Sequence, residues 1–224
     1  MSLDYHLPAR TKLLKPLFRM DHPKIHKFWM YSSNKILLIY KNTNIFHGSD
    51  QLLLKITQKS NDTFIDTSNI LELPKTFTEV SALNFLRFEF RNQTKKNLFL
   101  AGGPFLLMIE IQQNPNDQNL LRLVELGKSQ ETPPITCLAS CREEREEGFC
   151  LLSGDNLGKV RLWRFSGENE LIDNRDFQRI ESKQPQPITS LSFNKKLDKV
   201  VAGNSISEWR VWGFPGANEL KVKQ

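Results

Sequence analysis

The sequence predicts an all-β protein built as a repeating array of about four propeller-like blades. Glycines that mark one register of the chain recur at Gly48, Gly103, Gly154 and Gly203, so their spacings are 55, 51 and 49 residues. A repeat period near fifty residues is typical of propeller blades, each of which is a small antiparallel sheet. Apolar residues alternate near these glycines, and no segment after residue 25 has helical periodicity over ten or more residues. These observations favour strands throughout.

The last two units form the most similar pair. Leu151–Leu171 and Val200–Leu220 share a small residue before the marker glycine, a tryptophan nine residues after it and the ending Gly-x-Asn-Glu-Leu. The two tryptophans are Trp163 and Trp212. Because the matches fall at the same offsets, we expect the two segments to have the same local structure.

Each unit is expected to begin with an inner strand rich in β-branched and large apolar residues. Prolines precede several of these strands, where a missing N–H does not interrupt a ladder of hydrogen bonds. The inner strands begin at Ile25, Val80, Ile135 and Ile188, and the prolines are Pro74, Pro133, Pro134, Pro185 and Pro187.

Three more strands are expected in each unit. A polar hairpin leads into a second strand that ends at the marker glycine, and a tight turn leads into an alternating third strand. A more polar outer strand completes the unit. The hairpins are expected at residues 32–34, 91–97, 142–148 and 194–199, and outer strands at 120–126, 177–181 and 219–222.

The chain is expected to divide into a basic N-terminal arm, residues 1–22, and an array of blades, residues 23–224. The blades are expected at residues 23–73, 74–127, 128–181 and 182–224. The arm has two interpretations, a solvated tail or an anchor that buries its apolar residues along a neighbouring subunit. Its contact candidates are Arg10, Lys12, Leu13, Leu14, Leu17 and Phe18.

The segment Ser153–Trp163, SGDNLGKVRLW, resembles the core of a WD40 repeat, in which a Ser-Gly step, a glycine turn and a strand ending in Trp follow one another. Ala202–Trp212 is a weaker copy, and the similarity over residues 25–112 is one of pattern. The resemblance implies a β-propeller that binds other proteins. Because WD40 proteins usually close a ring of seven blades, about four blades imply a partial ring, unless the four close by themselves or belong to a longer gene product that completes the ring. A kelch-type propeller, with a similar period, is the alternative fold.

The sequence departs from the WD40 pattern at several positions. Arg164 and Gly213 replace the usual Asp after the tryptophan, and Leu157 replaces the usual Asp before the turn glycine. Thr57 and Gln112 stand where the first two units should have tryptophan. We therefore expect an incomplete hydrogen-bond network and greater reliance on apolar packing. An open ring exposes strand edges and apolar surface, which another subunit is expected to cover.

The composition and the N-terminal sequence bear on where in the cell the protein is expected. The chain has no apolar run of about 18 residues, which predicts no membrane span, and residues 1–16 lack a secretory signal pattern. Cys137, Cys141 and Cys150 are odd in number and lack paired zinc-ligand spacing, so buried thiols are the favoured interpretation. These features predict an intracellular protein, cytoplasmic or nuclear, that is not secreted.

The favoured function is that of a non-catalytic scaffold subunit in a larger assembly. No nucleophile elbow, phosphate loop or dinucleotide fingerprint occurs, so we expect no catalytic, cofactor-binding or metal-binding residues and no small-molecule substrate. Arg164 and Gly213, at strand ends of the last two units, are the predicted rim contacts. The alternative is a nucleic-acid-associated subunit that uses the net charge of +6, from 31 basic and 25 acidic residues. An enzyme with an unusual metal site is a third, weaker alternative.

Overall fold

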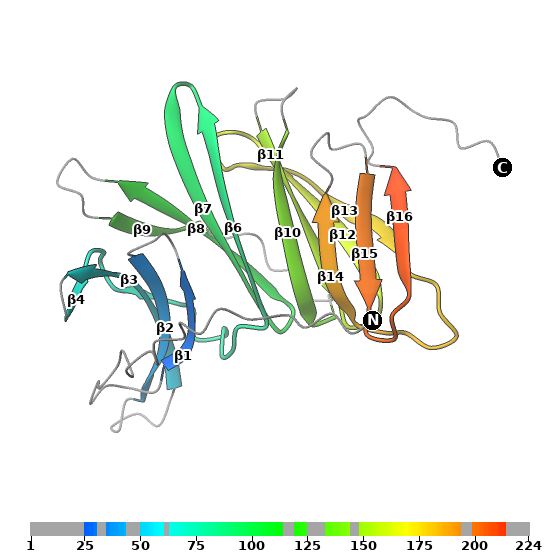
Figure 1. Cartoon of the computed structure of the whole chain (residues 1–224), viewed down its shortest axis with the longest axis horizontal. Helices are drawn as coiled ribbons and strands as arrows, with labels where there is room; N and C mark the ends of the chain where they lie inside the picture. The colour runs from blue at the N-terminus through cyan, green and yellow to red at the C-terminus, as the bar shows by residue number, and fades with distance from the viewer. Residues whose placement is uncertain are drawn as a thin grey trace, which may run out of the picture.

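The structure is a computed structural model that describes residues 25–30, 35–43, 50–60, 63–113, 119–124, 133–143, 148–193 and 199–213. These residues form four antiparallel sheets and contain no helix (Figure 1). The N-terminal arm, Gly48 and the outer strand expected at residues 219–222 lie outside the described residues.

Sheets 1 and 2 occupy the first half of the chain. Sheet 1 has the order β1-β2-β3-β4, with the short β5 also paired to β3, and sheet 2 has the order β6-β7-β8-β9. In sheet 1 the strands are β1 (Ile25–Met30), β2 (Lys35–Thr43), β3 (Asp50–Ser60), β4 (Thr63–Asp66) and β5 (Leu71–Glu72). In sheet 2 they are β6 (Ala82–Phe90), β7 (Gln93–Gly102), β8 (Phe105–Gln113) and β9 (Asn119–Val124).

Sheets 3 and 4 follow the same sequential order. Sheet 3 has the order β10-β11-β12-β13, and the described part of sheet 4 has the order β14-β15-β16. In sheet 3 the strands are β10 (Ile135–Glu143), β11 (Gly148–Asp155), β12 (Lys159–Phe165) and β13 (Leu171–Arg179). In sheet 4 they are β14 (Ile188–Phe193), β15 (Lys199–Asn204) and β16 (Trp209–Gly213).

The predicted inner strands correspond to β1, β6, β10 and β14, and three of them start at the predicted residue. Two other boundaries differ from the prediction. The hairpin of sheet 2 is a two-residue turn at Arg91 and Asn92, both with positive φ, so β7 already begins at Gln93. The outer strand of sheet 3 starts at Leu171 rather than residue 177, because a short turn at residues 166–170 returns the chain directly to β12.

The sheets stack face to face and bury apolar residues between them. In Figure 1 they follow one another across the view in chain order, with the inner strands β6, β10 and β14 side by side. Leu37 and Ile39 of sheet 1 share a cluster with Leu98 and Leu100 of sheet 2. The opposite face of sheet 2 packs on Phe149, Leu151 and Trp163 of sheet 3. A third cluster, between sheets 3 and 4, contains Leu152, Val160, Leu162, Ile188, Val200 and Ala202.

The register of sheet 2 differs from the one that the glycine spacing predicted. Leu83 pairs with Leu100, as Leu138 pairs with Ser153, so Ala101 occupies the position of Gly154. Gly103 instead lies in the tight turn between Gly102 and Phe105, with φ of +56°. Because the turn of sheet 2 is shorter than that of sheet 3, the tryptophan position falls on Ile109, which pairs with Leu98, and not on Gln112.

The architecture is therefore all-β, with four sequential antiparallel sheets whose faces pack on one another. The described residues do not form a closed barrel. This arrangement is consistent with a β-propeller-like array.

Candidate partner-binding face

A side-chain hydroxyl crosses each of the last two junctions between sheets. The Oγ of Ser81, next to β6, donates to the carbonyl of Ile135 in sheet 3 at 2.6 Å. In the next junction the Oγ1 of Thr136 donates to the carbonyl of Ile188 in sheet 4. Both hydroxyls also lie within hydrogen-bond distance of a carbonyl of their own sheet, Ala101 at 3.0 Å and Gly154 at 3.1 Å. The inner strands are thus fastened to one another by a repeated contact.

The residue that supplies the carbonyl also supplies an apolar side chain to the junction. Ile188 is fully buried, and its side chain lies against Gly154. A Cβ built on Gly154 would lie 2.6 Å from Cγ2 of Ile188 and 2.8 Å from Sγ of Cys137. The glycine is therefore required for the close approach of sheet 4, whereas its conformation needs no positive φ.

Sheet 4 presents the same kind of face on its far side. In its register, Val201 pairs with Ser192 on one side and with Val211 on the other, and Gly203 pairs with Trp209. These side chains alternate with those that pack on sheet 3, so they point away from it. We call this surface the terminal face; it comprises Ser190, Ser192, Val201, Gly203, Trp209 and Val211. Three of these residues match Leu152, Val160 and Leu162 of sheet 3, each 49 residues earlier.

The terminal face is exposed where the equivalent face of sheet 3 is buried. Val160 and Leu162 are fully buried by sheet 4, while the matching Trp209 and Val211 are 65% and 45% exposed. Val201 is 39% exposed, and Ile206 in the adjoining turn is exposed as well. A shallow, open pocket beside these residues is lined by Ser207, Glu208, Trp209, Arg210 and Val211.

The opposite end of the array differs. In sheet 1, Ile36 and Leu38 alternate with the residues that face sheet 2, and both are buried. Phe28 and Met30, on the inner strand β1, are exposed. A broad apolar face left uncovered across several strands is therefore found, among the described sheets, on sheet 4.

The turns that lead into β12 and β16 are held by equivalent side chains. Oδ1 of Asp155 accepts hydrogen bonds from the backbone N–H of Leu157 at 2.8 Å and of Lys159 at 2.9 Å. Oδ1 of Asn204 does the same for Ile206 and Glu208, at 3.2 and 2.9 Å. These Asx turns stabilise the hairpins locally. The WD40 pattern predicts an Asp at position 157, where Leu stands, whereas the turn is held by Asp155, two residues earlier.

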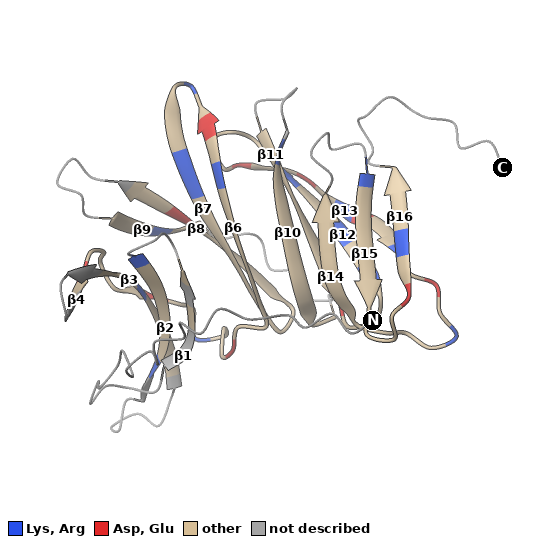
Figure 2. Cartoon of the chain, viewed as in Figure 1, with Lys and Arg blue, Asp and Glu red and all other residues tan. Residues whose placement is uncertain are grey.

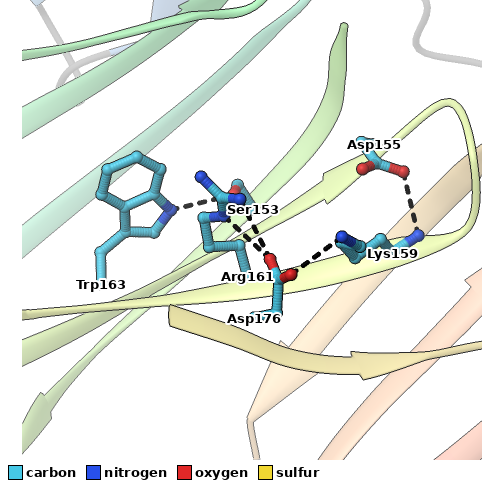
Figure 3. Close-up of polar contacts among 6 residues, drawn as sticks. All are labelled: Ser153, Asp155, Lys159, Arg161, Trp163 and Asp176. Carbon is cyan, nitrogen blue, oxygen red and sulfur yellow. Dashed lines mark hydrogen bonds and ion pairs between the residues drawn. The ribbon is translucent and has the colours of Figure 1, made fainter. Parts of the chain in front are cut away.

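Part of the polar network expected of a WD40-like blade is present in sheet 3. Nε1 of the buried Trp163 donates to Oγ of Ser153 at 2.9 Å, which fixes β12 to β11 (Figure 3). Trp212, the matching residue, instead makes an edge-to-face contact with Phe177, with ring centroids 6.2 Å apart. The position that Ser153 occupies in sheet 3 is held in sheet 4 by Ala202, which has no hydroxyl to accept a hydrogen bond from Trp212.

A group of charged residues lies on the outer part of sheet 3. The carboxylate of Asp176 on β13 accepts hydrogen bonds from Nζ of Lys159 at 2.8 Å and from Nη2 of Arg161 at 3.0 Å (Figure 3). The hydrogen bond from Lys159, together with Arg161, lowers the pKa of Asp176 below its ordinary value, although partial burial opposes the shift. These ion pairs connect β12 to the outer strand.

The predicted contact residues are only partly within the described structure. Arg164 is half-buried on β12, on the side of sheet 3 that faces sheet 4, and Gly213 is exposed at the end of β16. Among the described residues, no atom lies within 4 Å of a Cβ built on Gly213. Arg10, Lys12, Leu13, Leu14, Leu17 and Phe18 lie outside the described residues, so their role as contacts stays a prediction.

Cys137, Cys141 and Cys150 are thiols and are not joined in disulfides. Cys150 is buried, and burial raises the pKa of Cys137 to about 12, so this thiol is protonated at neutral pH. Within the described ranges, no three His, Cys, Asp or Glu residues come together in a way that could hold a metal ion.

Basic and acidic residues are interspersed over the four sheets. Figure 2 shows Lys and Arg on strands of every sheet, with acidic residues close to many of them. On sheet 4, Lys199 and Arg210 lie on β15 and β16, and Glu208 directly precedes β16. The described surface therefore offers scattered positive charges, without a continuous basic stripe along one element.

Comparison with known proteins supports the fold. No protein-family model and no curated protein sequence matches the chain. The structure is similar to that of the computationally designed Ika4 protein, with a TM-score of 0.50 and 18% identity over 88% of this chain and 94% of that one. It is also similar to Chaetomium thermophilum Sqt1 bound to the N-terminus of ribosomal protein L10, with a TM-score of 0.54 and 13% identity. That match covers 82% of this chain and 43% of Sqt1, so the chain spans less than half of its length. At these identities the similarity concerns the fold alone.

None of the described residues forms a helix with the length and apolar character needed to cross a membrane.

Proposed function

We propose that this protein is a non-catalytic, WD40-like scaffold subunit, and that its terminal face binds another protein within an assembly. The observation that carries the proposal is the exposure of Trp209, Val211 and Val201 on a face whose counterpart in sheet 3 is fully covered. The similarity to Sqt1, solved with a segment of a ribosomal protein, is in keeping with a fold that serves protein binding.

Physical reasoning favours a protein partner for this face. Fully covering one side chain of valine size or larger stabilises an interface by about 1.5–3 kcal/mol. Trp is enriched among the residues that dominate protein interfaces, because its large ring is costly to leave in water. Exposed apolar residues gathered on one face are typical of interaction sites.

The alternative, binding to nucleic acid, has less support from the described surface. Nucleic-acid affinity depends on many Lys and Arg contacts with phosphates and falls steeply as salt is raised. The basic residues of the described sheets are mixed with acidic ones (Figure 2). Assembly of this protein is therefore expected to withstand nuclease and moderate salt.

The proposal is tested by purifying the tagged full chain from the cells that produce it and measuring which proteins accompany it in stoichiometric amount. The double variant Trp209→Ser, Val211→Ser is expected to lose the accompanying protein at least tenfold relative to the unmodified chain. The matched control is Ile172→Ser on β13, which removes an equally exposed apolar side chain, 63% exposed, from a different sheet.

Two results would contradict the proposal. One is an unmodified chain that is recovered alone as a 26.0 kDa monomer. The other is a partner retained equally by the double variant and by the control. Release of the partner by nuclease would instead favour the nucleic-acid alternative.

A further inference from the structure

Both fully described junctions between inner strands use the same two contacts. The first residue of the incoming strand, Ile135 or Ile188, places its side chain in the core between the sheets. The carbonyl of that same residue accepts a hydrogen bond from the hydroxyl of Ser81 or Thr136. One aliphatic residue at the start of a strand thus provides both the apolar and the polar contact.

Sheet 4 contains the receiving half of this junction. Thr189 occupies the position of Thr136, one residue after the start of the inner strand, and Gly203 occupies the position of Gly154. Thr189 is exposed, and its hydroxyl lies 3.4 Å from the carbonyl of Gly203 in its own sheet. This distance is longer than the equivalent contact of Thr136, 3.1 Å.

Among the described residues, the space next to Gly203 lacks the aliphatic side chain that fills the space next to Gly154. A Cβ on Gly203 would lie 2.7 Å from Oγ of Ser190 and 3.9 Å from the carbonyl oxygen of Glu208. Within the described part of the chain, the terminal face therefore has a notch over Gly203 that holds no aliphatic group and is bordered by the hydroxyls of Ser190 and Thr189.

We infer that the terminal face receives a β-sheet of another protein, whose contacting strand begins with an aliphatic residue that enters the notch at Gly203 and accepts a hydrogen bond from Thr189 through its own carbonyl. This inference rests on the proposed function and adds the structural class of the partner. The partner's strand runs along β14 as β14 runs along β10. Val201, Trp209 and Val211 then pack on the partner's sheet, as Leu152, Val160 and Leu162 pack on sheet 4.

A second copy of this chain is a less suitable occupant. On the corresponding surface of sheet 1, Ile36 and Leu38 are buried, and Phe28 and Met30 of β1 are the exposed apolar side chains among its described residues, so it offers less free apolar surface across its strands. Nucleic acid is also less suitable, because the notch suits an aliphatic group and the exposed side chains around it include the apolar Val201, Trp209 and Val211. A strand of a different polypeptide meets both requirements.

The test uses a photo-crosslinking residue, p-benzoylphenylalanine, in place of Trp209 in the full chain, produced in the cells of origin. After irradiation of the intact assembly, the cross-linked residue of the partner is mapped by mass spectrometry. We expect a cross-link to a strand of an antiparallel sheet in a different protein. The same probe in place of Ile172 is the matched control and is expected to give less than a tenth of that product.

Three variants of the chain that carries the probe examine the notch and the hydroxyl. Gly203→Val fills the notch and is expected to lower the cross-link yield at least tenfold, while the melting temperature of the isolated chain changes little. Thr189→Val removes one neutral hydrogen bond at constant shape and is expected to lower the yield about three- to tenfold. Thr189→Ser keeps the donor and is expected to restore most of the yield.

The outcomes separate this inference from the proposed function. A protein cross-linked through a helix or a loop, or a partner insensitive to both Gly203→Val and Thr189→Val, overturns the inference and leaves the scaffold function standing. A cross-link to a second copy of the chain also overturns it. A cross-link to nucleic acid, or the absence of a product above the Ile172 control, overturns both.

Discussion

Sheets 3 and 4 have nearly the same local structure and opposite surroundings. Both have an Asx turn after the second strand, a glycine at the same paired position and a tryptophan on the third strand. On sheet 3 the far face is covered by sheet 4, while on sheet 4 the matching face is exposed. The strand pattern therefore specifies each sheet by itself, and the covering of that sheet's far face is a separate requirement.

The difference in burial predicts the largest contrast in stability. Leu162→Ala in the fully buried core between sheets 3 and 4 is expected to lower the free energy of unfolding by about 2–5 kcal/mol. Val211→Ala, at the matching exposed position, is expected to change it by about 0.5 kcal/mol or less in the isolated chain. Urea unfolding of both variants measures the contrast. Equal losses would show that the terminal face is covered within the chain itself.

A second prediction concerns the two glycines that allow sheets to approach. Gly154→Ala places a methyl group 2.6 Å from Ile188 and is expected to cost about 1–3 kcal/mol of unfolding free energy. Gly203→Ala meets chiefly the hydroxyl of Ser190, which can rotate, and is expected to be close to neutral in the isolated chain. Thermal unfolding distinguishes the two variants. A large loss from Gly203→Ala would mean that the notch is not vacant.

The smallest change in stability is expected at the ion pairs of Asp176 with Lys159 and Arg161, which sheet 3 has and the described residues of sheet 4 do not. Since the folded-state pKa of Asp176 is lowered, its contribution is present above the ordinary carboxyl pKa near 3.8 and is lost as pH falls through the folded-state pKa. Asp176→Asn is expected to lower stability at pH 7 by about 1 kcal/mol or less, since these ion pairs are partly exposed.

The difference between Asp176→Asn and the unmodified chain is expected to shrink as pH falls below about 4 and as salt is raised. Urea titrations at pH 7 and pH 3 measure it. A difference that persists unchanged at pH 3 would show that the introduced amide disturbs packing rather than ion pairing.

The sequence is sufficient to predict the first three strands of each sheet and their order, but it does not locate the short β4 and β5 of sheet 1. Inner strands starting at Ile135 and Ile188 were predicted to the residue, because their aliphatic spacing recurs in each unit. The register that the glycine spacing predicts for sheet 2 is wrong. Aligning Gly102-Gly103 with Ser153-Gly154 ignores that the turn in sheet 2 is shorter than the turn in sheet 3. Spacing alone does not report turn length, so a register derived from glycines shifts when a turn is shortened.

The candidate site was only partly foreseeable. An open ring predicts an exposed apolar face, but the sequence does not identify Trp209 and Val211 as its members, because alternation shows which residues share a face and not whether that face is covered. Thr136 and Thr189 follow the same Pro-Ile pair, and that repetition was the available signal for the hydroxyl contact. The threonine hydroxyl can make this contact only when a carbonyl of the next sheet, about fifty residues away in the chain, lies beside it.

The Asx turns at Asp155 and Asn204 also allow two hairpins to close through local contacts alone. Each turn is closed by hydrogen bonds spanning two to four residues, so the β11–β12 and β15–β16 hairpins require no contact with a neighbouring sheet. Such local contacts form quickly, whereas contacts between distant segments form slowly. During synthesis the β11–β12 hairpin can therefore close before the residues of sheet 4 have left the ribosome. Sheet 4 then meets a surface of sheet 3 whose β11–β12 hairpin has already formed.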